Sequence, residues 1–157
     1  MKHRAAYPHY MKRLFAILAF AAISLSAVTN LRGADDGGWM TDYKKAFEQA
    51  KAENKYVMID FSGESWCTPC KLLQREVFST QKFQDYAKTK FILVKVDFPD
   101  PVEPPKAARE LIEKYLPDIL LPTVVITAPD GKKLGQTGYY PGGPDVFIAN
   151  AQKVIKR

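Results

Sequence analysis

The two cysteines of this chain stand together in the motif Trp66-Cys67-Thr68-Pro69-Cys70. Two thiols separated by two residues can close a small disulfide and open it again, which is the basis of thiol–disulfide exchange. A disulfide with only a structural role would constrain the unfolded chain very little here, because the loop that it closes is so short. The spacing therefore indicates that Cys67 and Cys70 form a redox-active pair.

Two other uses of a C-x-x-C pair can be tested on the sequence. A structural zinc site needs four ligands, but the chain has no further cysteine, and its two histidines, His3 and His9, lie in an N-terminal segment that we expect to be removed. Covalent haem attachment needs a histidine directly after the second cysteine, where this chain has Lys71. We therefore expect no metal and no bound cofactor, and the Cys67–Cys70 disulfide itself is the expected redox group.

The first 33 residues differ in composition from the rest of the chain. Four basic residues within the first 13 positions precede an almost uninterrupted apolar run from Leu14 to Val28. A basic head followed by such a run is the pattern of a secretory signal peptide, so we expect residues 34–157 to be exported to the periplasm or another extracytoplasmic compartment. An uncleaved anchor is the alternative, although the run is shorter than the about 20 apolar residues that span a bilayer. The start codon (Met1 or Met11) and the cleavage site stay open.

The formal net charge of +6 comes mainly from this segment, which holds five basic residues and no acidic ones. Residues 34–157 carry 18 basic and 17 acidic side chains, a net charge of +1. A nucleic-acid-binding domain presents a basic surface, so this balance argues against a nucleic-acid partner. The length of the segment suits one compact domain, which we expect to be a monomer.

Hydrophobic periodicity predicts alternating helices and strands through residues 41–155. Helices are expected where apolar residues recur every three or four positions, and strands where short apolar runs lie between turn signals. The predicted helices are 41–53, 69–86 with an interruption at 79–80, 106–116 and 144–155, and the predicted strands are 55–62, 91–97, 122–127 and 132–139. The last two strands form an antiparallel pair about a turn at 129–131. This order predicts an α/β domain with a central mixed sheet flanked by helices.

The cysteine motif falls where the strand 55–62 passes into the next helix. A thiolate at a helix N-terminus faces unpaired backbone N–H groups and the positive end of the helix dipole. Thiols in C-x-x-C motifs also have lowered pKa values. Pro69 costs little there, because the first helical turn has no use for its missing N–H. The position of the motif therefore agrees with the redox interpretation of its spacing.

The chain resembles the thioredoxin family across residues 39–156. The sequence Trp-Cys-x-Pro-Cys follows a strand that ends in Asp-Phe and precedes a helix, as it does in thioredoxins. Asp60 matches the buried aspartate of that strand, and Lys95 matches the lysine of the next strand. Pro122, in Leu121-Pro122-Thr123, matches the cis-proline that faces the active site in thioredoxins. Gly138 matches the glycine that precedes their last helix. The resemblance implies a thioredoxin fold and a thiol–disulfide oxidoreductase activity.

The resemblance also implies roles for four residues. Cys67, the N-terminal and more accessible thiol, would attack a substrate disulfide as the thiolate, and Cys70 would then attack Cys67 and release the reduced substrate. Asp60 would take the proton from Cys70 through water, since burial raises the pKa of a carboxyl group toward the working pH. Lys95 would lie beside Asp60 and tune it. The alternative for Asp60 is a strand-end carboxylate that faces solvent.

Three residues near the cysteines are expected to contact substrate. The resemblance implies that Pro122 is cis, so that the backbone at Leu121 and Pro122 lies where a substrate strand could pair beside Cys67. A trans-proline that merely opens a strand is the alternative. Trp66 is expected to shield the disulfide and to offer apolar contact area, although simple packing would explain an aromatic residue there equally well.

The direction of electron flow follows from the resemblance as an expectation. Proline at the third motif position resembles the reducing members of the family, so we expect an exported reductase of protein disulfides that a membrane electron donor recharges. A disulfide oxidase or isomerase is one alternative, and a thioredoxin-like peptide-binding module without turnover is another. The chain departs from thioredoxin at Gly63-Glu64-Ser65, which places one extra residue between Asp60 and the motif. In this it looks more like exported thioredoxin-like proteins.

Overall fold

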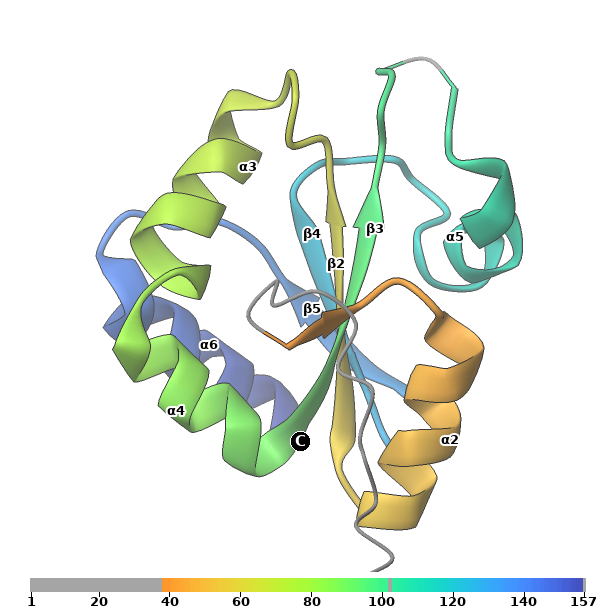
Figure 1. Cartoon of the computed structure of the whole chain (residues 1–157). Coiled ribbons are helices and arrows are strands. Elements are labelled where there is room, and N and C mark those ends of the chain that lie inside the picture. Colours follow the sequence, from red (N-terminus) through yellow and green to blue (C-terminus); the bar gives the residue numbers. More distant parts are fainter. Residues whose placement is uncertain (1–37, 102, 157) are drawn as a thin grey trace, which may run out of the picture. The chain divides into compact units, whose positions relative to one another are not determined.

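A five-stranded mixed sheet forms the centre of the protein (Figure 1). The structure is a computed structural model that describes residues 38–101 and 103–156, so the expected signal peptide at 1–33 lies outside the described residues. The strands are β1 (Trp39–Met40), β2 (Tyr56–Ser62), β3 (Phe91–Asp97), β4 (Thr123–Thr127) and β5 (Lys133–Thr137). They lie in the order β1-β3-β2-β4-β5. Strand β3 is parallel to both of its neighbours, β1 and β2. Strand β4 is antiparallel to both of its neighbours, β2 and β5.

Helices cover both faces of this sheet (Figure 1). The helical elements are α2 (Tyr43–Glu53), α3 (Thr68–Leu73), the π-helical η1 (Gln74–Phe78), α4 (Gln81–Lys90), the 3₁₀ turn η2 (Lys106–Ala108), α5 (Arg109–Tyr115) and α6 (Gly143–Ile155). One face carries α3, α4 and α6, and the other carries α2 and α5. The sheet is therefore the middle layer of three.

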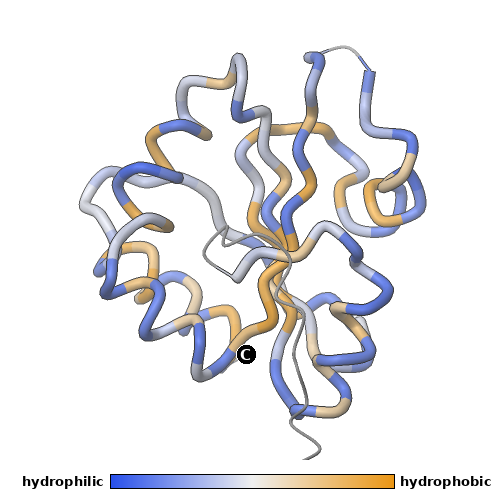
Figure 2. Tube along the Cα trace, viewed as in Figure 1, coloured by the Kyte–Doolittle hydropathy of each residue, from blue (hydrophilic) through white to orange (hydrophobic). Residues whose placement is uncertain are grey.

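Two hydrophobic cores lie on opposite faces of the sheet. Successive residues of a strand point to opposite faces, and β2 divides accordingly. Val57, Ile59 and Phe61 join the core under α2 and α5, whereas Met58 joins the core under α3, α4 and α6. Figure 2 shows the central strands as largely hydrophobic and the outer turns of the helices as hydrophilic. By the same alternation, Asp60 shares the face of Met58 and lies on the side of α3.

Side-chain caps set where two of the helices begin. Asp42 Oδ1 accepts the N–H of Lys45 at 3.2 Å at the start of α2. Thr80 Oγ1 accepts the N–H of Phe83 at 3.3 Å at the start of α4. Such caps satisfy N–H groups that have no partner within the first turn. Helix α2 ends at Asn54, whose left-handed conformation (φ 50°) closes the last turn.

The structure confirms the predicted fold class and the mixed central sheet. The predicted helix 69–86 consists of three elements, α3, η1 and α4, and the interruption at 79–80 separates the last two. The predicted helix 106–116 begins as the 3₁₀ turn η2. The sequence pattern does not indicate β1, because two residues are too few to show a period. Among the described residues, no helix is both long enough and apolar enough to cross a bilayer.

Candidate active site

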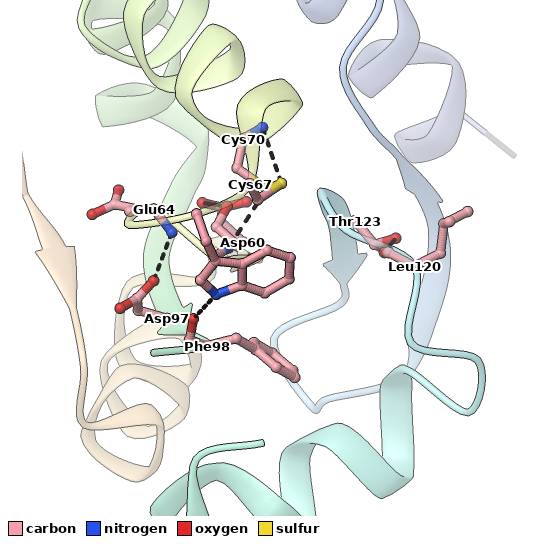
Figure 3. The surroundings of a disulfide bond; sticks show 11 residues. Asp60, Glu64, Cys67, Cys70, Asp97, Phe98, Leu120 and Thr123 are labelled. Atoms are coloured by element: carbon pink, nitrogen blue, oxygen red, sulfur yellow. Dashed lines mark hydrogen bonds between the residues drawn. A yellow bond between two sulfur atoms is a disulfide. The ribbon is translucent and has the colours of Figure 1, made fainter. Parts of the chain in front are cut away.

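The disulfide between Cys67 and Cys70 lies where β2 passes into α3 (Figure 3). Cys67 is the N-cap residue of α3, and its Sγ accepts the N–H of Cys70 at 3.3 Å. Pro69 lies in the first turn, where its missing N–H is not needed. The two cysteines are 6% and 2% exposed, so Cys67 is the more accessible of two buried residues. The first turn of the helix thus directs one backbone N–H group toward the sulfur of Cys67.

A backbone donor from the preceding loop reaches the second sulfur. The N–H of Gly63 donates to Cys70 Sγ at 3.5 Å. A hydrogen bond to the charged form of an acid favours that form. The same bond would therefore stabilise a thiolate on Cys70 after reduction. The sequence gives no sign of this contact, because it depends on the path of the loop between Ser62 and Trp66.

Asp60 lies in the interior, only 1% exposed, and does not face solvent. Burial raises the pKa of its carboxyl group to about 7. A hydrogen bond from Ser62 Oγ to Asp60 Oδ2 at 2.7 Å and the positive charge of Lys95 act in the opposite direction. Among the described residues, Asp60 Oδ1 has no hydrogen-bond donor. A buried carboxyl group that changes its charge near neutral pH is suited to general acid–base chemistry.

Lys95 lies opposite Asp60 in the register of β2 and β3. Its ammonium forms an ion pair with Glu64 Oε1 at 2.8 Å. The N–H of Glu64 donates to Asp97 Oδ1 at 2.9 Å, which holds the loop against the end of β3 (Figure 3). Glu64 belongs to the segment that makes this chain one residue longer than thioredoxin before the motif. Its contact with Lys95 is a feature that the sequence pattern does not predict.

Trp66 is fixed by a hydrogen bond and by packing. Its Nε1–H donates to the carbonyl oxygen of Phe98 at 2.7 Å (Figure 3). Its ring covers Gly63 so closely that a Cβ at this glycine would lie 2.5 Å from Trp66 Cε2. The residue still exposes 38% of its surface. Packing and exposed contact area are therefore both present in this one side chain.

The peptide bond between Leu121 and Pro122 is cis. Gly138 lies against this turn, and a Cβ there would come within 3.0 Å of the Pro122 carbonyl oxygen. The residues just before the turn, Ile119 and Leu120, are 53% and 73% exposed, and Figure 3 draws Leu120 among the surroundings of the disulfide. Two exposed large aliphatic residues just before the cis turn offer apolar contact area. The run Ile119-Leu120-Leu121 before Pro122 is the sequence signal for them.

The comparisons with known proteins agree with this geometry. The family described as a thioredoxin-like domain matches residues 43–153, and the chain belongs to this family. It is 26% identical over 117 residues to the disulfide bond reductase DsbH of Chlamydia pneumoniae, covering 73% of this chain and 70% of that protein. A solved structure titled DsbH oxidoreductase matches with a TM-score of 0.66 and 26% identity over 81% of this chain and 93% of that one.

A second solved structure is the disulphide isomerase of Xylella fastidiosa Temecula1. It matches with a TM-score of 0.56 and 25% identity over 79% of this chain and 98% of that one. Together with the Cys67–Cys70 pair, these likenesses identify the chain as a thioredoxin-like thiol–disulfide oxidoreductase. Within the described residues, no group of three or more His, Cys, Asp or Glu side chains could hold a metal ion.

Proposed function

We propose that the protein is an exported reductase of protein disulfides that acts through the Cys67–Cys70 dithiol. The observation that carries this proposal is the position of both sulfurs at the start of α3, with one backbone N–H group directed at each of them. The likeness to DsbH, a disulfide bond reductase, supports the reducing direction. The basic and apolar pattern of residues 1–33 supports export. On this proposal the functional domain is residues 34–157.

The proposed reaction is a two-step thiol–disulfide exchange. The Cys67 thiolate attacks one sulfur of the substrate disulfide, a mixed disulfide forms, and the other substrate sulfur leaves as a thiolate. The Cys70 thiol gives its proton to Asp60, directly or through water, and its sulfur then attacks Cys67 Sγ. The Cys67–Cys70 disulfide forms and the second substrate sulfur leaves. The substrate gains two electrons and the protein loses two.

The surrounding residues are assigned supporting roles in this scheme. Asp60 acts as the base for Cys70, since burial brings the pKa of its carboxyl group to about 7. Lys95 adjusts the charge around Asp60. Trp66 and the cis turn at Leu121-Pro122 form the substrate-binding rim, which Ile119 and Leu120 extend with exposed apolar surface.

The partners follow from the chemistry of the cycle. The substrates are proteins with accessible disulfides, and the oxidised enzyme has to be reduced again before the next turnover. Because an oxidising compartment offers no reducing thiol pool of its own, we assign the recharging step to a membrane electron donor. No further cofactor is needed, since the Cys67–Cys70 pair carries both electrons.

Single cysteine variants test the proposed roles. Cys67→Ser is expected to abolish reduction of insulin disulfides, because the attacking thiolate is gone. Cys70→Ser is expected to accumulate mixed disulfides with substrate proteins, because the resolving thiol is missing. The measurement is the insulin turbidity assay, together with non-reducing gels of the Cys70→Ser protein from its native compartment. Full insulin-reducing activity in Cys67→Ser would contradict the assignment.

A disulfide isomerase is the second candidate, since the similar Xylella fastidiosa structure is that of a disulphide isomerase. The reduction potential of the Cys67–Cys70 pair separates the two. A value near that of thioredoxin, about −270 mV, supports a reductase, and a value near that of protein disulfide isomerase, about −180 mV, supports the isomerase. Equilibration with glutathione or dithiothreitol buffers gives this potential.

A further inference from the structure

The loop Gly63-Glu64-Ser65 places a carboxylate beside the lysine that faces Asp60. Glu64 is held by two interactions. Its backbone N–H donates to Asp97 Oδ1 at 2.9 Å, and its Oε1 accepts a hydrogen bond from Lys95 Nζ at 2.8 Å. The Lys95 side chain is 8% exposed and the Glu64 side chain is 39% exposed. The ion pair therefore has one buried partner and one partner at the surface.

Both partners of this ion pair act on the charge of Asp60, in opposite directions. The hydrogen bond that reaches the Asp60 carboxyl group comes from the neutral Ser62 hydroxyl at 2.7 Å. Lys95 is the residue paired with Asp60 across β2 and β3, and its ammonium forms an ion pair with Glu64. An ammonium beside a carboxylate favours the ionised carboxylate, whereas a second carboxylate disfavours it. Glu64 thus opposes the effect of Lys95 on Asp60.

The remaining elements around Asp60 add few charges. On β3 the charged residues near it are Lys95 and Asp97, and the loop after β2 contributes Glu64. On β4 the residue opposite Asp60 is Val124, which does not titrate. Helix α3 contributes the two cysteines, which titrate only when the disulfide is reduced.

We propose that Glu64 is a positioning residue that draws the Lys95 ammonium toward the surface end of their ion pair and thereby weakens the stabilisation that Lys95 gives to the ionised Asp60 carboxylate. The inference rests on the proposed function for its catalytic meaning, because Asp60 must lose its proton before it can accept the one from Cys70. Glu64 then sets the pH above which the resolving step becomes fast. A pocket of about 410 Å³ lined by Glu64 and Lys95, among other residues, gives solvent access to the pair.

The test is a titration of Asp60 in the full oxidised chain with and without the Glu64 charge. The ¹³Cγ resonance of Asp60, assigned by its loss in Asp60→Asn, is followed from pH 4 to pH 9. In Glu64→Gln the midpoint is expected to fall by about one pH unit or more, because one of the two carboxylates that oppose the effect of Lys95 on Asp60 is then neutral, while Asp97 remains. The matched control is Glu113→Gln, which removes one exposed carboxylate on α5 and is expected to leave the midpoint unchanged.

A double-mutant cycle shows whether Glu64 acts through Lys95. In a Lys95→Met background, the shift caused by Glu64→Gln is expected to fall to less than half. A shift of equal size in both backgrounds, or no shift in Glu64→Gln alone, would overturn the proposal. Should Lys95→Met not fold, Glu64→Asp replaces it. This variant keeps the charge but shortens the reach to Lys95, so the midpoint is expected to fall, and an unchanged midpoint would count against the proposal.

The rate measurement separates this inference from the proposed function. In single-turnover reduction of a disulfide substrate, the acid limb of the pH–rate profile is expected to move to lower pH by the same amount as the Asp60 midpoint. The carbon titration needs no substrate. A protein that reduces no disulfide but shows the Asp60 shift would therefore contradict the proposed function and leave the action of Glu64 on Asp60 supported.

Discussion

At the scale of single residues, Asp60 is the group whose surroundings differ most from water. Its burial raises its pKa to about 7, against an ordinary value of 3.8 for an aspartate. Between these two pH values the folded protein keeps a proton that the unfolded chain releases. Folding stability therefore falls as the pH rises through this window, and above it the protein carries a buried carboxylate.

Asp60→Asn is expected to stabilise the oxidised protein at pH 8 and to have little effect near pH 4. The amide carries no charge to bury and can still accept the hydrogen bond of Ser62. Each pKa unit corresponds to about 1.4 kcal/mol and the pKa is raised from 3.8 to about 7, so the free energy of unfolding should rise by about 4 kcal/mol at pH 8. Urea denaturation at pH 4, 6 and 8 measures this. A gain independent of pH, or an equal gain in the exposed-site control Asp118→Asn, would contradict the burial argument.

At the scale of elements, the loop between β2 and α3 is held to the sheet by backbone and side-chain contacts. The N–H of Gly63 reaches Cys70, and the N–H of Glu64 reaches Asp97. The Trp66 indole reaches the carbonyl oxygen of Phe98 and covers Gly63. A loop tied at three points to its neighbours can hold the disulfide in one place relative to Asp60.

Gly63→Ala is expected to displace the Trp66 ring. The new Cβ would lie 2.5 and 2.6 Å from two ring carbons, so the indole has to move and its hydrogen bond to Phe98 is lost. Overpacking of this kind costs about 1–3 kcal/mol in the free energy of unfolding. A double-mutant cycle by urea denaturation measures it, since the cost should largely disappear in a Trp66→Ala background. An equal cost in both backgrounds would place the strain in the backbone.

At the scale of the whole molecule, an aromatic cluster joins four elements on one face of the sheet. Trp39 of β1 and Phe83 of α4 both contact Phe78 of η1, each with ring centroids 4.8 Å apart. Phe147 of α6 packs edge-on against Phe78 and Phe83, with centroids 5.4 and 5.7 Å away. These contacts join the consecutive elements η1 and α4 to β1 and α6, which lie far from them in the sequence, so the cluster makes their stabilities interdependent.

Phe147→Ala is expected to destabilise the protein by about 3–5 kcal/mol, the usual cost of removing a buried phenylalanine. The reason is the cavity left between η1, α4 and α6. Thermal or urea unfolding of the oxidised protein measures the loss. The matched control is Tyr140→Ala, which removes an aromatic side chain that is 55% exposed and should cost less than about 1 kcal/mol. Similar losses in the two variants would argue against the cluster.

The sequence predicts strands β2 to β5 of the sheet, its flanking helices and the place of the cysteine motif, because these follow from local periodicity and from one motif, but it does not indicate β1. It does not predict that η1 is π-helical, because five residues are too few to distinguish a wider helix from an α-helix. The resemblance places Lys95 beside Asp60. It does not predict that the ammonium of Lys95 forms an ion pair with Glu64. The partner of a long side chain depends on the three-dimensional path of a neighbouring loop, which no local pattern encodes.

The register of β2 has a consequence for how such proteins can diverge. The last residue of β2 paired with β3 is Ser62, opposite Asp97. The loop Gly63-Glu64-Ser65, in which the resemblance to thioredoxin implies one extra residue, lies beyond it. An insertion there leaves the buried strand pairs unchanged, so evolution can vary the loop without disturbing the core. Each such variation brings a different side chain toward Asp60 and Lys95. The fold can thus stay the same while substitutions in this loop change the charges that act on Asp60.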